Sequence, residues 1–93
     1  MSIFLKQIVK QKIKKITYDD ILFYSEQYGF SIDENQAREM ANYLTHHDLD
    51  PFDATDRQMM FQALAQITNE KTAEEAEQLL FQLIQTYGLE HLF

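Results

Sequence analysis

The sequence predicts an all-α protein, a compact bundle of four or five short helices, from its composition and its turn residues. Its 93 residues include ten Leu, ten Gln and seven Ala but only one Val, so the enrichment typical of sheets is missing. No stretch alternates cleanly between apolar and polar residues, and no Asn-Gly or Asp-Gly pair marks a hairpin. The length fits one domain, which we expect to span residues 1–93.

The first predicted helix covers about residues 3–15 and follows Ser2, a candidate N-cap. With successive side chains about 100° apart, its apolar residues share one broad face: Phe4, Leu5, Ile8, Val9, Ile13 and Ile16. Lys6, Lys10 and Lys14 lie opposite, and Lys12 projects from the middle of the apolar face, where its ammonium has to snorkel. Residues 1–16 therefore form a basic amphipathic segment.

The next two helices carry capping signals. Residues 18–28 are opened by Thr17 and ended by Gly29. Residues 34–46 follow Asp33, which pairs with a Gln at the third helical position as in a capping box. The inward stripes are Tyr18, Ile21, Leu22, Ser25 and Tyr28 on the earlier helix, and Ala37, Met40, Ala41 and Leu44 on the later one.

A loop with the only proline, residues 48–53, precedes the last two helices. Asp53 is the expected N-cap of a helix over residues 54–67. The last helix spans about residues 72–87, after a short turn capped by Thr68 or Asn69 and before a Gly stop. The predicted inward residues are Met60, Leu64 and Ile67, followed by Ala73, Ala76, Leu80, Leu83 and Tyr87.

Charge divides the chain into two parts. Residues 1–16 hold five lysines and no acid, whereas residues 17–93 hold three bases and fifteen acids and form a body of net charge −12. Because such a body repels nucleic acid and anionic membranes, we expect neither as a partner except through the basic helix, with Lys6, Lys10 and Lys14 as docking residues. The helix can instead lie on its own body, the interpretation we favour, since attraction within one chain acts at high effective concentration.

Four short motifs carry a family resemblance: Ile16-Thr17-x-Asp19-Asp20-Ile21-Leu22, Gln27-Tyr28-Gly29-Phe30-Ser31, Asp50-Pro51-Phe52 and Ala65-x-Ile67-Thr68. They resemble the YqfT-like family of short, uncharacterised Bacillales proteins. The motifs are caps and turns, and the resemblance implies a bacterial cytosolic protein without transferring any activity or functional residue. A cytoplasmic location also agrees with the apolar run at residues 3–5, which is too short for a signal peptide.

Neither the acid-rich loop nor the histidines predict a metal site. With Asp48 as the first position of a twelve-residue calcium loop, Asp53 stands where the turn glycine belongs and Met59 where the bidentate Glu is required. Adjacent His46 and His47 point about 100° apart on a helix and do not face one metal. Because the chain also lacks cysteine, we expect no metal and no cofactor.

Patterns typical of enzymes and of DNA-binding proteins are missing or incomplete. The sequence has no glycine-rich phosphate loop, no Gly-x-Ser-x-Gly elbow and no His-Glu-x-x-His pair. Ser25 and Gly29 have the spacing of a helix-turn-helix, but Asn35 and Arg38 stand where that motif buries apolar side chains. We therefore expect no enzymatic activity.

Aromatic residues lie on helix faces that the helical period assigns to solvent. Phe23 lies nearly opposite its inward stripe, Phe81 is about 130° from its own, and Phe93 ends an apolar tail. Two interpretations stay open: the first helix or the tail covers at least one of Phe23 and Phe81, or these residues form a surface for a protein partner or a second copy. We predict a small, non-enzymatic interaction module. The alternative is peripheral docking of the basic helix on an anionic membrane or nucleic acid.

Overall fold

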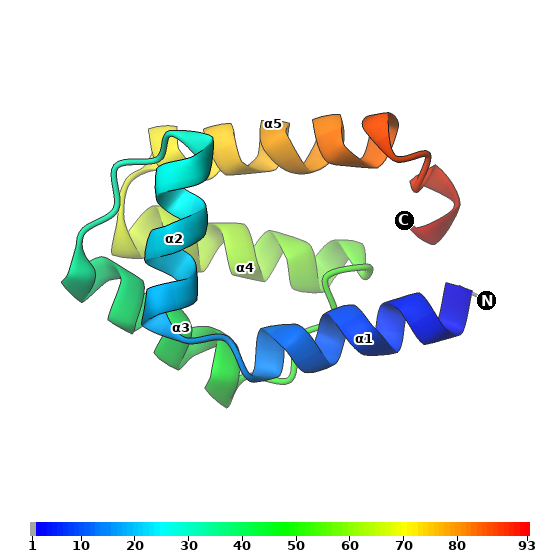
Figure 1. Ribbon diagram of the computed structural model, residues 1–93, viewed down its shortest axis with the longest axis horizontal. Coiled ribbons are helices and arrows are strands. Elements are labelled where there is room, and N and C mark those ends of the chain that lie inside the picture. Colours follow the sequence, from blue (N-terminus) through cyan, green and yellow to red (C-terminus); the bar gives the residue numbers. More distant parts are fainter. Residues whose placement is uncertain (1) are drawn as a thin grey trace.

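The structure is a computed structural model that describes residues 2–93, with side chains from residue 4 onward. Over these residues the all-α prediction is confirmed, and no strand is present. The helices are α1 (Ser2–Lys14), α2 (Tyr18–Tyr28), α3 (Glu34–His46), α4 (Ala54–Ile67) and α5 (Glu70–Thr86), followed by the 3₁₀ turn η1 (Glu90–Leu92) (Figure 1). The bounds of α2, α3 and α4 are those predicted from their caps.

α3 and α4 are the central helices of the fold, and the other three helices pack on them. α4 and α5 form an antiparallel pair, α3 packs on α4, and both α1 and α2 pack on α3 (Figure 1). The radius of gyration is 12.8 Å, close to the roughly 12 Å of a globular chain of this length. The start of α1 and the C-terminal turn η1 lie at the same end of the molecule (Figure 1).

Side-chain caps fix the starts of three helices as predicted. At α2 the Thr17 hydroxyl accepts from the Asp20 N–H at 3.2 Å, and the Asp20 carboxylate accepts from the Thr17 N–H at 3.1 Å. Asp33 and Gln36 form the equivalent capping box at α3, and the Asp53 carboxylate caps α4. These bonds satisfy N–H groups that no helical carbonyl can reach.

Two other predicted starts are wrong. α1 begins at Ser2, so this residue lies within the helix and is not its N-cap. α5 begins at Glu70 instead of Thr72, because the Asn69 side chain accepts from the Thr72 N–H at 2.8 Å and so starts the helix earlier. Thr72 consequently lies in the first turn of α5, where it is buried.

The two glycines end helices as predicted. Gly29 has a φ of +79° and Gly88 a φ of +63°, in the left-handed region that favours glycine. Just beyond them, the Phe30 N–H donates to the Ser25 carbonyl, and the Leu89 N–H donates to the Ile84 carbonyl, each at 2.8 Å. This is the Schellman pattern, which satisfies the last carbonyls of a helix and turns the chain back.

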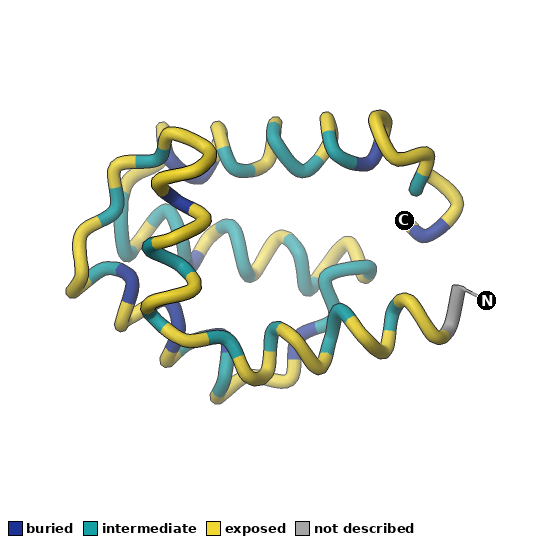
Figure 2. Tube along the Cα trace, in the orientation of Figure 1, coloured by how far each residue is buried: buried dark blue, intermediate teal, exposed yellow. Residues whose placement is uncertain are grey.

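The hydrophobic core combines four alanines with five larger apolar side chains. The buried apolar residues are Ala37, Met40, Ala41, Leu44, Leu49, Ala63, Ala73, Ile84 and Leu92, and no large side chain among the described residues is fully buried. The predicted stripe of α3 is therefore confirmed, and Figure 2 shows most of α1 exposed or half-buried. Tyr28 and Tyr87, predicted to face inward, are exposed, because each ends its helix at the edge of the packed region.

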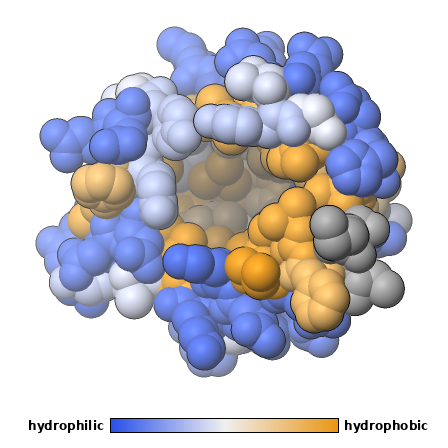
Figure 3. Space-filling view, turned by 45° about the vertical axis from the view of Figure 1, so that its right-hand side comes forward, coloured by the Kyte–Doolittle hydropathy of each residue, from blue (hydrophilic) through white to orange (hydrophobic). Residues whose placement is uncertain are grey.

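The packed helices leave the molecule open on one side. A view toward the end where the chain termini lie shows a hollow with a hydrophobic floor and a largely hydrophilic rim (Figure 3). Part of the apolar side-chain surface is therefore left outside the core, where it remains accessible.

We expect Asp33→Ala to lower the free energy of unfolding by about 1 kcal/mol, within the ~0.5–2 kcal/mol range for lost N-caps. The substitution removes the acceptor of the Gln36 N–H. Asn35→Ala, at an exposed position of the same helix, is the matched control, with a change within about 0.5 kcal/mol. Denaturant unfolding measures both. Equal stabilities of the two variants would contradict a stabilising role for the Asp33 cap.

Candidate functional site

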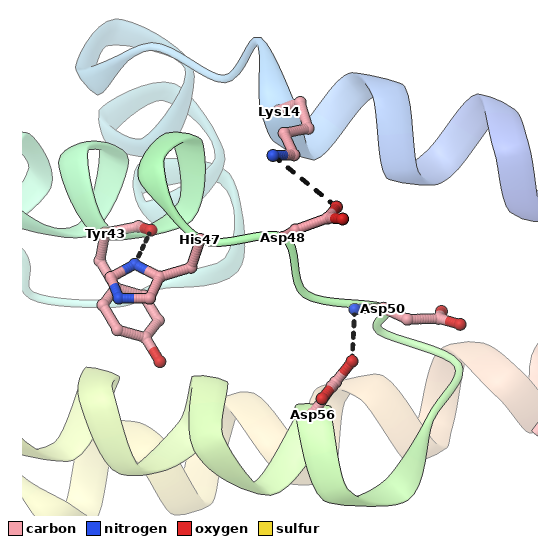
Figure 4. Close-up of polar contacts among 6 residues, drawn as sticks. All are labelled: Lys14, Tyr43, His47, Asp48, Asp50 and Asp56. Carbon is pink, nitrogen blue, oxygen red and sulfur yellow. Dashed lines mark hydrogen bonds and ion pairs between the residues drawn. The ribbon is translucent and has the colours of Figure 1, made fainter.

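α1 attaches to its own body through lysine side chains. Lys14 Nζ lies 3.7 Å from Asp48 Oδ1 in the loop after α3 (Figure 4), and the Lys6 ammonium lies 5.5 Å from the centre of the Phe52 ring. Lys6 and Lys10 are half-buried, whereas Lys14 is exposed. Two of the three candidate docking lysines thus contact the chain itself, which agrees with the favoured interpretation that the basic helix lies on its own body.

The predicted apolar face of α1 is only partly covered, which corrects the expectation from periodicity. Val9 and Ile13 are half-buried, but Phe4 is 74% exposed and Ile8 is 56% exposed. The reason is geometric: the apolar residues span about half of the helix circumference, whereas packing against one neighbour covers a stripe of roughly 100°. The uncovered edge of α1 is therefore apolar.

Two basic side chains border this uncovered edge. Ile8, Lys12 and Lys15 line one shallow cleft together with Gln11 and Asp20. Lys12 and Lys15 are exposed, so α1 presents an apolar edge flanked by positive charge. We call Phe4, Ile8, Lys12 and Lys15 the α1 ridge.

The acidic loop before α4 uses its carboxylates to hold the backbone. Asp56 accepts from the Asp50 N–H at 2.9 Å (Figure 4), and Asp50 accepts from the Phe52 N–H at 2.9 Å. Asp53 caps α4, and the Arg57 guanidinium donates to a carbonyl of the same loop at 3.1 Å. The acids of this loop that face the backbone thus serve to accept its N–H groups and to fix the loop conformation before α4. Among the described residues, no three His, Asp or Glu side chains converge as a metal-binding group.

His46 and His47 each bond back to α3. The Nδ1 atom of either ring lies 2.8 Å from the carbonyl oxygen of the residue four positions earlier, and since a carbonyl only accepts, Nδ1 carries the proton. The His47 ring also stacks on Tyr43, with ring centroids 4.2 Å apart (Figure 4). Both imidazoles thus satisfy carbonyls at the end of the helix.

Arg38 joins α3 to α2 on the outer surface. Its guanidinium donates to the Glu34 carboxylate at 2.7 Å and lies 3.8 Å from the centre of the Tyr18 ring. The hydrogen bond to Glu34 raises the pKa of Arg38 above its ordinary value. A helix-turn-helix would have a buried apolar residue at this position. Arg38 is instead exposed and contacts the first residue of α2 through a cation–π interaction.

The three candidate interaction aromatics lie on three different elements. Phe23 on α2 is 56% exposed and makes an edge contact with the neighbouring Tyr24 ring, and Phe81 on α5 is 51% exposed. The ring of Phe93 lies 4.9 Å from that of Phe52 and 5.1 Å from the Arg57 guanidinium. Because both side chains are more than half exposed, the interpretation in which α1 or the C-terminal tail covers one of them is not supported, and cover by a protein partner or a second copy is the interpretation that stays open. Their role as an interaction surface stays a prediction.

An open groove of about 570 Å³ lies between α4 and α5. Phe61, Leu80 and Phe81 contribute its large apolar side chains, and Glu70, Glu74 and Glu77 form an acidic rim on α5. The sequence analysis missed this groove. The sequence feature that could have indicated it is the spacing of these three acids, which places them on the same helix face as Phe81. That face forms a groove only because α4 packs beside α5.

A second, smaller cavity of about 280 Å³ lies between the same two helices. Arg57 is the one charged residue that lines it, and the others are apolar: Pro51, Met60, Phe61, Ala76, Leu79, Leu80 and Leu83. Phe61 and Leu80 line both cavities. The contact between α4 and α5 therefore leaves apolar side chains uncovered on more than one side.

Comparison with known proteins shows the family. Residues 1–84 match the family described as "protein of unknown function (DUF2624)". The chain belongs to this family. It is also 34% identical over 80 residues to the "uncharacterized protein YqfT" of Bacillus subtilis (strain 168), covering 86% of this chain and 95% of that relative. The family resemblance seen in the caps and turns is thereby confirmed. No solved structure matches the chain.

The match between chain and family covers the five-helix body. The α1 ridge and the lining of both cavities lie within residues 1–84, whereas Phe93 and η1 follow the matched region. Within residues 2–93, no helix combines the length and the apolar composition needed to cross a bilayer.

We expect the triple variant Lys6→Gln, Lys10→Gln and Lys14→Gln to lower the free energy of unfolding by about 0.5–1 kcal/mol at low ionic strength. Exposed ion pairs contribute only ~0.2–1 kcal/mol each, and salt screens them, so the effect shrinks at high ionic strength. Lys12→Gln with Lys15→Gln is the control, because these lysines lie on the uncovered edge. Unfolding at low protein concentration and two salt concentrations measures both. Equal stability of the triple variant and the unsubstituted chain at low salt would contradict attachment through these lysines.

Proposed function

We propose that this member of the DUF2624 family is a non-enzymatic protein-interaction module. The observation that carries the proposal is its surface area. A folded monomer of 11.1 kDa exposes about 5,700 Å² by the scaling of surface with mass, whereas this chain exposes 6578 Å². The excess of roughly 900 Å² is similar to the ~800 Å² that each partner buries in a standard protein interface.

The exposed side chains are of the kind that interfaces use. Ten large hydrophobic side chains are exposed among the described residues. Seven of them are aromatic: Phe4, Phe23, Tyr24, Tyr28, Phe81, Tyr87 and Phe93; the other three are Leu5, Ile8 and Met59. Aromatic residues are favoured anchors because they bury a large area at low conformational cost. Scattered apolar residues are normal on a surface, but Phe81 lies on a groove, which supports this groove as the binding surface.

The polar side chains support a role without catalysis. A catalytic centre needs a nucleophile, acid or base free to meet a substrate, usually with a partner that shifts its pKa. Here the loop carboxylates accept backbone N–H groups, and both His46 and His47 donate to carbonyls of their own helix. Ser25 is buried within α2. The proposal accordingly assigns these groups to folding.

A second candidate function is docking of α1 on an anionic membrane. It is favoured by the α1 ridge, in which Phe4 and Ile8 are exposed beside Lys12 and Lys15, as in helices that lie at a membrane surface. The acidic body, with its net charge of −12, opposes approach to an anionic surface. For the same reason we rank nucleic acid below both. Binding of a protein remains our first proposal.

We expect Phe81→Ser to abolish association while the monomer stays folded. Because Phe81 is half exposed, the fold loses only about 1 kcal/mol, roughly half the value of a fully buried Phe. Phe23→Ser is the matched control, with nearly equal exposure but on α2, away from the groove. Thermal melting reports the fold, and light scattering with crosslinking in a native lysate reports association.

Three results would contradict the proposal in different ways. A large fall in melting temperature at every protein concentration would assign Phe81 to the fold. Loss of association by Phe23→Ser alone would move the interaction surface to α2. Unchanged melting, unchanged mass and unchanged crosslinked products in both variants would remove the interaction role altogether.

A further inference from the structure

We propose that the groove between α4 and α5 binds the α1 ridge of a second copy of this chain, reciprocally, in a twofold dimer. The inference rests on the proposed interaction function and names its partner. It depends on two features of one chain that complement each other in charge. One is the exposed α1 ridge, with apolar anchors and two lysines. The other is a partly apolar groove with a glutamate rim on α5, which Arg57, Gln58 and Gln62 of α4 also line.

The α1 ridge has the spacing of a helix that binds in a groove. Phe4 and Ile8 are four residues apart, so they project from the same helix face, and both are more than half exposed. Helices that occupy hydrophobic grooves use anchors at this spacing. Lys12 continues the line from Ile8 by another four residues, and Lys15 lies beside it in the same cleft.

The groove offers the complementary surface. Phe61 and Leu80 provide apolar contact area, and Phe81 is half exposed at the same site. Glu70, Glu74 and Glu77 are exposed and spaced so that they follow one face of α5. A helix edge with apolar anchors followed by lysines suits this groove. Its anchors would bury apolar area against Phe61 and Leu80, and its ammonium groups would face the carboxylates.

The chain's own α1 does not occupy the groove. From residue 4 onward, where its side chains are described, no residue of α1 lines the groove, and α1 packs on α3 and on the loop that contains Asp48 and Phe52. That attachment uses Lys6 and Lys14, which leaves the ridge residues free for a second molecule. The ridge and the groove of one chain are thus both uncovered in the monomer.

Charge and area favour a second copy over an unrelated partner. Residues 1–16 carry five positive charges and the rest of the chain carries −12, so each copy supplies both halves of the match. The excess exposed area of roughly 900 Å² per chain suffices for a standard interface. Reciprocal docking uses each ridge and each groove once, which closes the assembly as a dimer instead of extending it into a filament.

Charge reversal on both sides tests the proposal. Lys12→Glu with Lys15→Glu, and separately Glu74→Lys with Glu77→Lys, should each convert the dimer to a monomer, as measured by sedimentation velocity and light scattering. Mixing the two variants should restore a dimer of one copy of each, because each ridge then meets a groove of opposite charge. All four substitutions in one chain should restore the homodimer.

Two further variants keep the test specific. Glu75→Lys with Glu90→Lys changes the net charge equally at exposed positions that do not line the groove, and should leave the dimer intact. Phe4→Ser should weaken dimerisation by at least about tenfold, as expected for an interface anchor. It should leave the melting of the monomer unchanged, since this side chain is 74% exposed.

The possible outcomes distinguish failure of the proposed dimer from failure of the proposed interaction function. A wild-type monomer at every concentration, with association to another protein still lost in Phe81→Ser, would overturn the second copy and keep the interaction role. A monomer that binds anionic phospholipid vesicles through Lys12 and Lys15 would overturn the dimer in favour of membrane docking. A dimer that survives both charge reversals would overturn the assignment of ridge and groove.

Discussion

Packing through alanine is the constraint on which the rest of this structure depends. Where α3, α4 and α5 meet, the buried positions include Ala37, Ala41, Ala63 and Ala73. Each of these side chains removes little apolar area from water, so the core contributes less than one built from Leu and Phe. Larger apolar side chains such as Met40, Leu44 and Ile84 are buried as well, whereas Phe61, Leu80 and Phe81 are half-buried or exposed and line the groove between α4 and α5. The choice of residues thus limits the core and leaves the apolar surface on which the proposed interaction depends.

The elements that the sequence predicts correctly are those decided locally. The capping boxes at Thr17 and Asp33 and the stops at Gly29 and Gly88 involve residues at most five positions apart, so their geometry follows from the residues themselves. The α3 stripe was predictable because its apolar residues share one narrow helix face, which is the face that a helix buries when it packs against the rest of the protein. These residues are Ala37, Met40, Ala41 and Leu44.

Two of the errors arise where a neighbouring element decides, and a third is a local choice between capping residues. Periodicity identifies the apolar face of α1 but not which edge of that face α3 covers, and so it misses the exposure of Phe4 and Ile8. The early start of α5 came from a choice between two adjacent capping residues, Thr68 and Asn69, and only the Asn69 side chain reaches the Thr72 N–H. The groove needed the pairing of two helices, which no single helical stripe specifies.

α1 is the element whose position is least strongly fixed. Its main helix contact is with α3, and its polar attachments to the loop after α3 are an exposed ion pair at 3.7 Å and a cation–π contact at 5.5 Å, interactions of about 1 kcal/mol or less when exposed to solvent. Elements held by few buried contacts open at low free-energy cost. The same helix carries the α1 ridge, so in the proposed dimer a loose attachment would help: a helix that moves slightly on its own body can adjust to a groove without unfolding the rest. Because residues 1–84 match the family and contain α1, the groove and all of the core except Leu92, a binding property shared by the family must reside in this part of the chain.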